Sequence, residues 1–145
     1  MYTGRYYHKL DDKNRFSLPA SFRKNLGKMC VITKGLDGCL FVFDTAKWTK
    51  TLGDVSNLEF TKRTNRDFVR LLTNQAEEVQ IDTHGRALLS GHLKEQASLQ
   101  RDIVIVGSLD RVEIWDQTTY HEYIKRIEVN ADEIAEAVST KQEKL

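Results

Sequence analysis

The chain has 145 residues, enough for one ordinary domain or two small ones. Its 40% hydrophobic and 30% charged residues and its net charge of +1 are typical of a soluble globular protein and exclude a disordered one. No apolar run approaches the roughly 20 residues of a membrane-spanning helix, and the N-terminus lacks the apolar core of a signal peptide, so we expect no membrane partner.

The first half of the chain predicts short strands and helices in alternation. The expected elements are a strand over 2–10, a tight turn over 11–14, a strand over 15–18, a short helix over 19–26, and an apolar hairpin with strands over 29–33 and 39–43. Pro19 suits the first position of the short helix, and Gly27 is placed to end it. Asp44 or Thr45 then caps a helix that runs to residue 52 or 53, before a connection over 53–58.

The second half begins with an amphipathic helix over 65–76, in which Phe68, Leu71 and Leu72 recur at helical spacing. The expected elements after it are a strand over 77–81, a turn over 82–85, a weak helix over 90–97, and strands over 103–106 and 112–115. Asp116 then caps a helix. The tail as far as residue 145 has helical propensity.

One stretch occurs twice. LDDKNRFSLPASFR at 10–23 returns as IDTHGRALLSGHLK at 81–94, with every matched position 71 residues later. We therefore expect a duplicated architecture. Neither copy, at roughly 45 residues, could bury an adequate core alone. We expect one interlocked domain over 1–145, built from repeats at 5–47 and 76–119, with a helical tail at 120–145.

Each copy encodes a turn with a basic residue directly after it. Asp11 and Asp82 suit the first position of a four-residue turn between two strands. Gly85 suits the fourth position, and Asn14 tolerates the same positive φ at some cost in strain. An arginine follows each turn and can reach back to the aspartate. The aspartates then serve either as turn-stabilising partners or as ligand contacts.

Charge and cysteine content narrow the possible partners and compartment. Residues 1–35 hold eight basic and two acidic side chains, whereas residues 110–145 hold five basic and nine acidic ones. A basic front suits a polyanion, although uneven solvated faces are common. Cys30 and Cys39 form no Cys-x-x-Cys pair, so we expect a reducing cytoplasm and two small core residues; a disulfide between neighbouring strands is the alternative.

These motifs resemble the MraZ family of bacterial transcription regulators over nearly the whole chain. The resemblance is carried by LDDKNRFSLPASFR, IDTHGRALLSGHL and VIVGSLDRVEIWD. It implies an α+β fold like that of AbrB-type DNA-binding proteins: a double-split β-barrel of two pseudo-symmetric repeats with flanking helices. Two features depart from the family pattern: Asn14 stands where Gly is usual, and Ser90-Gly91 replace the usual proline region of the second copy.

The resemblance also implies a function. It predicts a cytoplasmic, nucleoid-associated regulator that forms homo-oligomeric rings and binds G-rich direct repeats in double-stranded DNA upstream of its own division and cell-wall gene cluster. The family's DNA contacts fall on Lys13, Arg15 and Arg86. Because His84 replaces the lysine of the first turn, the second copy is expected to contribute less to DNA binding, and Arg86 either contacts DNA or braces the barrel through Asp82.

Elementary chemistry supports this assignment. Arginine bidentate to guanine is the commonest specific base contact. Further basic residues of the first repeat would meet phosphates, which position the protein without specifying sequence; these are Arg5, Lys9, Arg23 and Lys24.

Other function classes have weaker support. An enzyme is disfavoured because the four histidines are scattered and no metalloprotease, nucleophile-elbow or phosphate-loop motif occurs, so neither a catalytic site, a metal nor a cofactor is predicted. An AbrB-type antitoxin and a structural ring-forming interaction module remain as alternatives. Aromatic residues near Trp48 and Trp115 would line the subunit interface in the latter, or else pack in the core.

Overall fold

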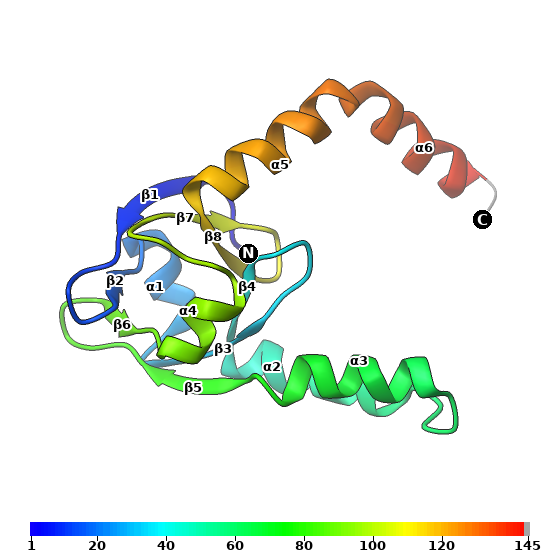
Figure 1. The fold of residues 1–145 in the computed structure, drawn as a ribbon. Helices are drawn as coiled ribbons and strands as arrows, with labels where there is room; N and C mark the ends of the chain where they lie inside the picture. The colour runs from blue at the N-terminus through cyan, green and yellow to red at the C-terminus, as the bar shows by residue number, and fades with distance from the viewer. Residues whose placement is uncertain (144–145) are drawn as a thin grey trace.

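The order of elements repeats once along the chain, as the self-similarity predicts. The computed structural model describes residues 1–143. The first half consists of β1 (Arg5–Lys9), β2 (Arg15–Ser17), α1 (Ala20–Leu26), β3 (Met29–Lys34), β4 (Leu40–Asp44), α2 (Thr45–Ser56) and α3 (Arg63–Thr73). The second half consists of β5 (Glu77–Gln80), β6 (Arg86–Leu88), α4 (Gly91–Gln96), β7 (Asp102–Gly107), β8 (Val112–Asp116), α5 (Gln117–Val129) and α6 (Ala131–Glu143). The fold is α+β and is built from two AbrB-like repeats (Figure 1).

The two halves exchange strands. A six-stranded antiparallel sheet has the order β1-β7-β8-β4-β3-β5, and β2 pairs with β6 in a second, two-stranded sheet. The lead strand of each repeat pairs with the other half: β1 with β7, and β5 with β3. β1 thereby covers the outer edge of β7, and β5 that of β3, so that these two strands have no exposed backbone edge, while β1 and β5 are the edge strands of the sheet.

The predicted tight turn forms at residues 11–14 between two strands, but these strands do not pair with each other. The strands on either side of it, β1 and β2, belong to different sheets. The reason lies in the core: Phe16 of β2 lies opposite Ala87 of β6, and the two side chains are 1% and 2% exposed. The small Ala87 side chain leaves room for the phenylalanine ring.

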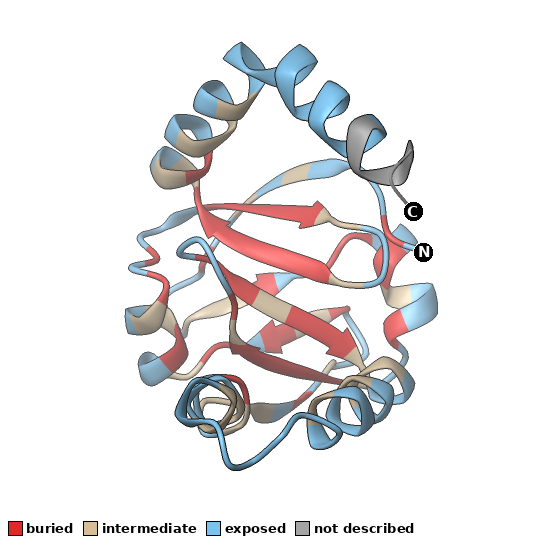
Figure 2. Cartoon of the chain, turned by 90° about the vertical axis from the view of Figure 1, so that its right-hand side faces the viewer, coloured by how far each residue is buried: buried red, intermediate tan, exposed pale blue. Residues whose placement is uncertain are grey.

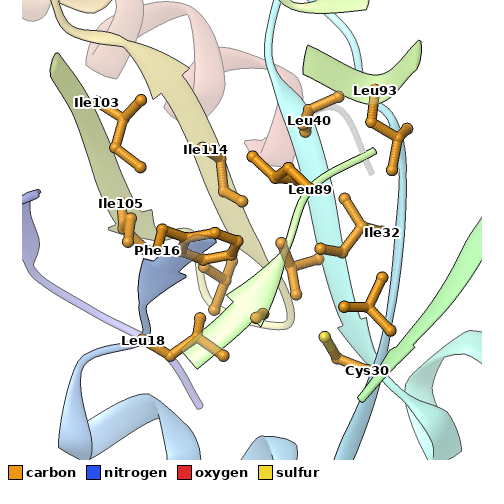
Figure 3. Close-up of a cluster of buried hydrophobic side chains, with 14 of the residues drawn as sticks. Phe16, Leu18, Cys30, Ile32, Leu40, Leu89, Leu93, Ile103, Ile105 and Ile114 are labelled. Atoms are coloured by element: carbon orange, nitrogen blue, oxygen red, sulfur yellow. The ribbon is translucent and has the colours of Figure 1, made fainter. Parts of the chain in front are cut away.

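Side chains from both repeats fill one core between the two sheets. Phe16, Leu18 and Cys30 of the first repeat meet Leu89 and Leu93 of the second (Figure 3). Full burial of such a side chain contributes about 1.5–3 kcal/mol, so neither half retains its core without the other. Figure 2 shows the same division, with buried residues on the strands and exposed residues on the outer helices.

The helices α2 and α5 begin where the sequence predicts, whereas α3 spans Arg63–Thr73 and not the expected 65–76. Asp44 Oδ1 accepts the backbone N–H of Lys47 at 2.7 Å, and Asp116 Oδ2 accepts that of Thr119 at 3.4 Å. The expected connection over 53–58 is wrong, because α2 continues to Ser56. Gly53 lies exposed within α2, where glycine costs about 1 kcal/mol without ending a helix.

Smaller differences concern α1 and the tail. Pro19 is the N-cap of α1 and not its first helical residue, with φ −54° and ψ 139°. The predicted helical tail is α6, except for residues 144 and 145, which lie outside the described part of the chain. Cys30 and Cys39 are both buried and free, as expected of small core residues.

The two turns and the outer helices lie at opposite ends of the molecule. The chain segments before β2 and β6 project together at one end, whereas α2 and α3, and separately α5 and α6, extend toward the other (Figure 1). Within residues 1–143, no helix combines the length and apolar character needed to cross a membrane.

Candidate functional site

A single carboxylate organises the first turn. Asp11 Oδ1 accepts the backbone N–H groups of Lys13 and Arg15, both at 2.8 Å. Asp11 Oδ2 accepts the Nε–H of Arg15, also at 2.8 Å. Backbone bonds close the same turn, because Asn14 donates its N–H to the Asp11 carbonyl at 3.0 Å and Asp11 donates its own to the Arg15 carbonyl at 2.9 Å. Arg15 is therefore held at both its backbone and its side chain.

The second turn repeats this geometry. Asp82 Oδ1 accepts the backbone N–H groups of His84 and Arg86 at 2.8 and 2.9 Å, and Asp82 Oδ2 accepts the Nε–H of Arg86 at 3.1 Å. The expected aspartate–arginine pair is thus present in both repeats. Asn14 and Gly85 have φ of 59° and 77°, the left-handed conformation that the turn prediction requires at these positions.

These hydrogen bonds favour the charged form of each aspartate. The backbone N–H of Arg15 is the main cause that lowers the pKa of Asp11 below its usual value of 3.8, and the N–H of Arg86 acts likewise on Asp82. Each carboxylate is therefore a permanent anion at neutral pH. It neutralises part of the arginine charge and fixes the direction of the guanidinium.

Pairing of β2 with β6 brings the two arginines onto one surface. Arg15 lies opposite Leu88, and Arg86 lies opposite Ser17. Phe16 and Ala87 point inward. Because side chains alternate along a strand, the residues on either side of them, which form the two pairs just named, share the outer face. Arg15 and Arg86 are diagonal neighbours across the strand pair, which places their Cβ atoms about 7–8 Å apart.

Each guanidinium keeps its two terminal nitrogens, with four N–H donors, for a ligand. The aspartate occupies Nε, and no side chain within residues 1–139 bonds Nη1 or Nη2 of Arg15 or Arg86. A planar pair of donors matches two adjacent acceptors, such as O6 and N7 of guanine or two phosphate oxygens. Lys13, exposed on the same turn, adds a flexible positive charge.

The structure does not bring all the predicted contacts together. Lys9 lies on the last position of β1, near the first turn, and pairs with Asp102 at 3.3 Å on the surface. Arg5 lies at the far end of β1, where its Cζ stands 5.0 Å from the centre of the Tyr120 ring of α5. Arg5 is therefore packed away from the turns, and we remove it from the candidate interface. Arg23 lies beneath the second turn, against Gly85.

Sequence reasoning missed one residue of the site. Lys94 of α4 donates to Asn14 Oδ1 at 3.1 Å, across the boundary between the repeats. A signal existed, since Arg23 and Lys94 occupy matched positions of the two copies and both are basic. The sequence alone did not show that each faces the turn of the opposite copy.

Other chemistry lacks a comparable arrangement. Among the side chains that the structure describes, residues 1–139, no three histidine, cysteine, aspartate or glutamate groups lie close enough together to hold a metal ion. The four histidines are dispersed; for example, His8 lies on β1 and His121 on α5.

Comparisons with known proteins agree with the duplicated organisation. The family model described as "MraZ protein, putative antitoxin-like" matches twice, at residues 1–71 and 72–141. Relatives named "Transcriptional regulator MraZ" occur in Carboxydothermus hydrogenoformans (43% identical) and Moorella thermoacetica (42% identical), each aligned over 94% of this chain and 95% of the relative. The relative of that name in Clostridium beijerinckii is 42% identical over 96% of this chain and 97% of its own length.

Proposed function

Because the chain belongs to the MraZ family, we propose that it is a DNA-binding transcriptional regulator that recognises a specific sequence. The observation that carries the proposal is the pair of arginines, one from each repeat, on one face of the β2–β6 pair. Each is held by an aspartate through Nε, with its two terminal nitrogens directed to a ligand. Rigid bidentate donors are the groups that read guanine in the major groove.

The surrounding charges suit the phosphate backbone. Lys13 and Lys9 lie at or next to the first turn, both on the surface, and would contact phosphates on either side of the bases that Arg15 reads. Such contacts fix the register of the protein without specifying sequence. His84 replaces lysine in the second turn, so we assign the larger share of the phosphate contacts to the first repeat.

We infer that the target consists of short G-rich direct repeats upstream of the protein's own gene, within a division and cell-wall gene cluster. A site of two arginines and few lysines binds one DNA element weakly. Several copies of the chain that engage several elements gain affinity by avidity, by a factor on the order of 10² to 10⁴. In a ring, each subunit is related to the next by the same rotation, so neighbouring subunits present their sites in the same order. DNA elements repeated in the same direction match this arrangement.

Two outer surfaces support a homo-oligomer. The first, on α3 and the β3–β4 turn, surrounds a hollow of about 260 Å³ and exposes Leu36, Phe68 and Leu71. The second, on α6, exposes Ile134 and Val138 four residues apart. Residues 62–73 carry four basic and one acidic side chain, whereas residues 131–139 carry three acidic and no basic ones. Opposite charges around apolar centres favour mutual docking.

One chain cannot make this contact with itself. α3 and α6 extend from opposite sides of the sheets, with the body of the molecule between their attachments (Figure 1). Docking of α6 on α3 of the next chain joins two different surfaces. Such heterologous contacts close into rings when the rotation permits. We infer that the chain is one interlocked domain, with repeats at 5–47 and 76–119, that assembles in the cytoplasm on nucleoid DNA through these helices.

The proposed function is tested by fluorescence anisotropy with DNA from upstream of the protein's own gene. One probe carries the direct repeats, a second has the repeats scrambled, and each titration runs at two salt concentrations. We expect tight binding to the repeats, and a fall in affinity with salt whose slope counts the phosphate contacts. Equal affinity for scrambled DNA would reduce the protein to a non-specific DNA binder. Absence of binding at low salt would favour the antitoxin or protein-interaction alternatives.

A further inference from the structure

The turns that carry the two arginines are held crosswise by the opposite repeats. Lys94 of the second repeat donates to the side chain of Asn14 in the first turn, with 3.1 Å between Nζ and Oδ1. Arg23 of the first repeat lies with its guanidinium and Cδ against Gly85 of the second turn. Asn14 and Gly85 are matched positions of the repeat, and so are Lys94 and Arg23. The molecule thus makes the same connection twice, with different chemistry.

The backbone repeats this crossed arrangement. Leu18 donates its N–H to the carbonyl of Gly85, and Leu89 donates its N–H to the carbonyl of Asn14, both at 2.9 Å. Leu18 and Leu89 are again matched positions, and both are buried. The fourth residue of each turn therefore contacts the other repeat in two ways. Its carbonyl accepts a backbone N–H from that repeat, and its side chain or Cα packs against the basic residue of that repeat.

The identity of each turn residue agrees with its basic partner. Both positions have positive φ, which glycine adopts freely and asparagine tolerates. A Cβ at Gly85 would stand 2.5 Å from Cδ and from Cζ of Arg23, so the wide guanidinium occupies the space of a side chain there. The slimmer ammonium of Lys94 leaves that space in the first turn to the Asn14 amide, whose oxygen it binds. Glycine pairs with arginine, and asparagine pairs with lysine.

Neither basic side chain is placed as a free phosphate contact. Lys94 and Arg23 are both half-buried, and the Nε of Arg23 is buried without a hydrogen-bond partner among the described residues. Lys24, the neighbour of Arg23 on α1, is exposed by contrast. A phosphate contact would require the opposite arrangement, with the charged head group in solvent and the stem alone packed.

We propose that Arg23 and Lys94 are positioning residues for DNA binding, which lock the turns of the opposite repeats and so fix the separation and direction of Arg15 and Arg86. The proposal rests on the proposed function and replaces the earlier assignment of Arg23 to a phosphate. Each repeat thus supplies the brace for the turn of the other repeat. A site with two arginines at a fixed separation discriminates base spacing, whereas two independently mobile arginines do not.

The first experiment distinguishes bracing from phosphate contact. Lys94→Met removes the hydrogen bond and retains the length of the side chain. We expect affinity for the repeat DNA to fall about tenfold, the loss typical of one charge-assisted hydrogen bond, with an unchanged slope of affinity against salt and an unchanged melting temperature. Lys94→Arg sets a guanidinium against the Asn14 side chain, the combination that the pairing rule disfavours, and is expected to weaken binding as well. Lys125→Met, which removes an exposed charge on α5, serves as a remote control.

Two outcomes would overturn the proposal. A reduced salt slope for Lys94→Met would assign a direct phosphate contact to Lys94, and a parallel fall in melting temperature would assign a purely structural role.

The second experiment tests the pairing rule itself. Gly85→Asn places a side chain in the space of the Arg23 guanidinium and is expected to weaken DNA binding. The double variant Gly85→Asn with Arg23→Lys recreates the asparagine–lysine pair of the first turn and is expected to bind more tightly than Gly85→Asn alone. Failure of the second substitution to restore affinity would overturn the crossed brace.

A measurement without DNA separates this proposal from the proposed function. In ¹H–¹⁵N spectra of the free protein, Lys94→Met is expected to shift the Asn14 side-chain amide and the backbone amides of the first turn, with no change at the second turn. Undisturbed signals at Asn14 would overturn the brace whether or not the protein binds DNA. Conversely, a shifted Asn14 in a protein that binds no DNA would contradict the proposed function and retain the brace as a structural contact.

Discussion

Arg15 and Arg86 are diagonal neighbours on one face of the β2–β6 strand pair, although 71 residues separate them in the chain. Each is oriented by an aspartate that precedes it by four residues. The duplication therefore produces one composite site. An approximate two-fold axis passes between Phe16 and Ala87, beneath the two guanidinium groups.

This symmetry predicts that the second repeat contributes directly to DNA binding. Arg15→Ala and Arg86→Ala are each expected to weaken binding to the repeat DNA by roughly 1–3 kcal/mol, the contribution of one bidentate base contact. The melting temperature should change little, because half-exposed ion pairs contribute at most about 1 kcal/mol. Anisotropy titrations and thermal unfolding of both variants check this.

Comparing the DNA affinity and the melting temperature of the two variants shows whether both arginines contact DNA. If Arg86→Ala retains full affinity but unfolds at lower temperature, the second arginine braces the structure through Asp82 and only the first reads DNA. Lys125→Ala, a remote surface change on α5, controls for the general loss of positive charge.

A second prediction concerns pH. The pKa values of Asp11 and Asp82 are lowered in the folded state, mainly by the backbone N–H groups of Arg15 and Arg86. A carboxyl group whose folded pKa lies below its unfolded value of about 3.9 stabilises the fold above that value. This stabilisation is lost as pH falls through the folded pKa.

Carbon-detected NMR titration should therefore place both midpoints below 3.8. Midpoints at or above that value would contradict the turn geometry.

A third prediction addresses the core beneath the site. Phe16 is 1% exposed and packs against both repeats, so Phe16→Ala should lower the free energy of unfolding by about 3–5 kcal/mol. Leu88→Ala, on the outer face of the same strand pair and 56% exposed, is expected to change it by no more than about 0.5 kcal/mol. Urea denaturation of the two variants checks the difference. Similar losses in both would show that the strand pair is not oriented with Phe16 inward.

The sequence predicted local features better than pairings. The offset of 71 residues predicted two turns, and the residue types Asp, Asn and Gly predicted their conformation, because these depend on steric preferences within a few residues. The partner of β2 could not be predicted in the same way. A three-residue strand such as Arg15–Ser17 has too short a pattern to specify a partner, and the choice of β6 depends on the fit of Phe16 over Ala87 across the whole core.

The same limit applies to the charged residues. Arg5, Lys9 and Arg23 are equivalent in the sequence as basic residues near the first motif. Their environments differ because β1 carries Arg5 to α5, while α1 directs Arg23 under the opposite turn. Counting the charged residues in each segment of the sequence cannot distinguish Arg5, which packs on the Tyr120 ring, from Lys9, which lies at the surface near the first turn.

The final prediction concerns assembly and follows from the difference between the two docking surfaces. If α6 of one chain binds α3 of the next, then Leu71→Asp on α3 and Ile134→Asp on α6 should each abolish higher oligomers, since both place a charge in an apolar contact. Leu109→Asp, at a side chain 60% exposed and outside both surfaces, is the matched control and should leave assembly unchanged. Masses are measured by sedimentation velocity at micromolar concentration.

Mixing the two defective chains identifies the kind of contact. The Leu71→Asp chain retains an intact α6, and the Ile134→Asp chain retains an intact α3, so together they can form one productive contact. A heterologous interface therefore predicts monomers of each variant alone and a dimer, with no larger species, in the mixture. An interface between identical surfaces would instead leave one of the two variants dimeric by itself. A wild-type chain that sediments as a monomer would contradict the assembly altogether, and the avidity on which binding to several DNA repeats depends would have no physical basis.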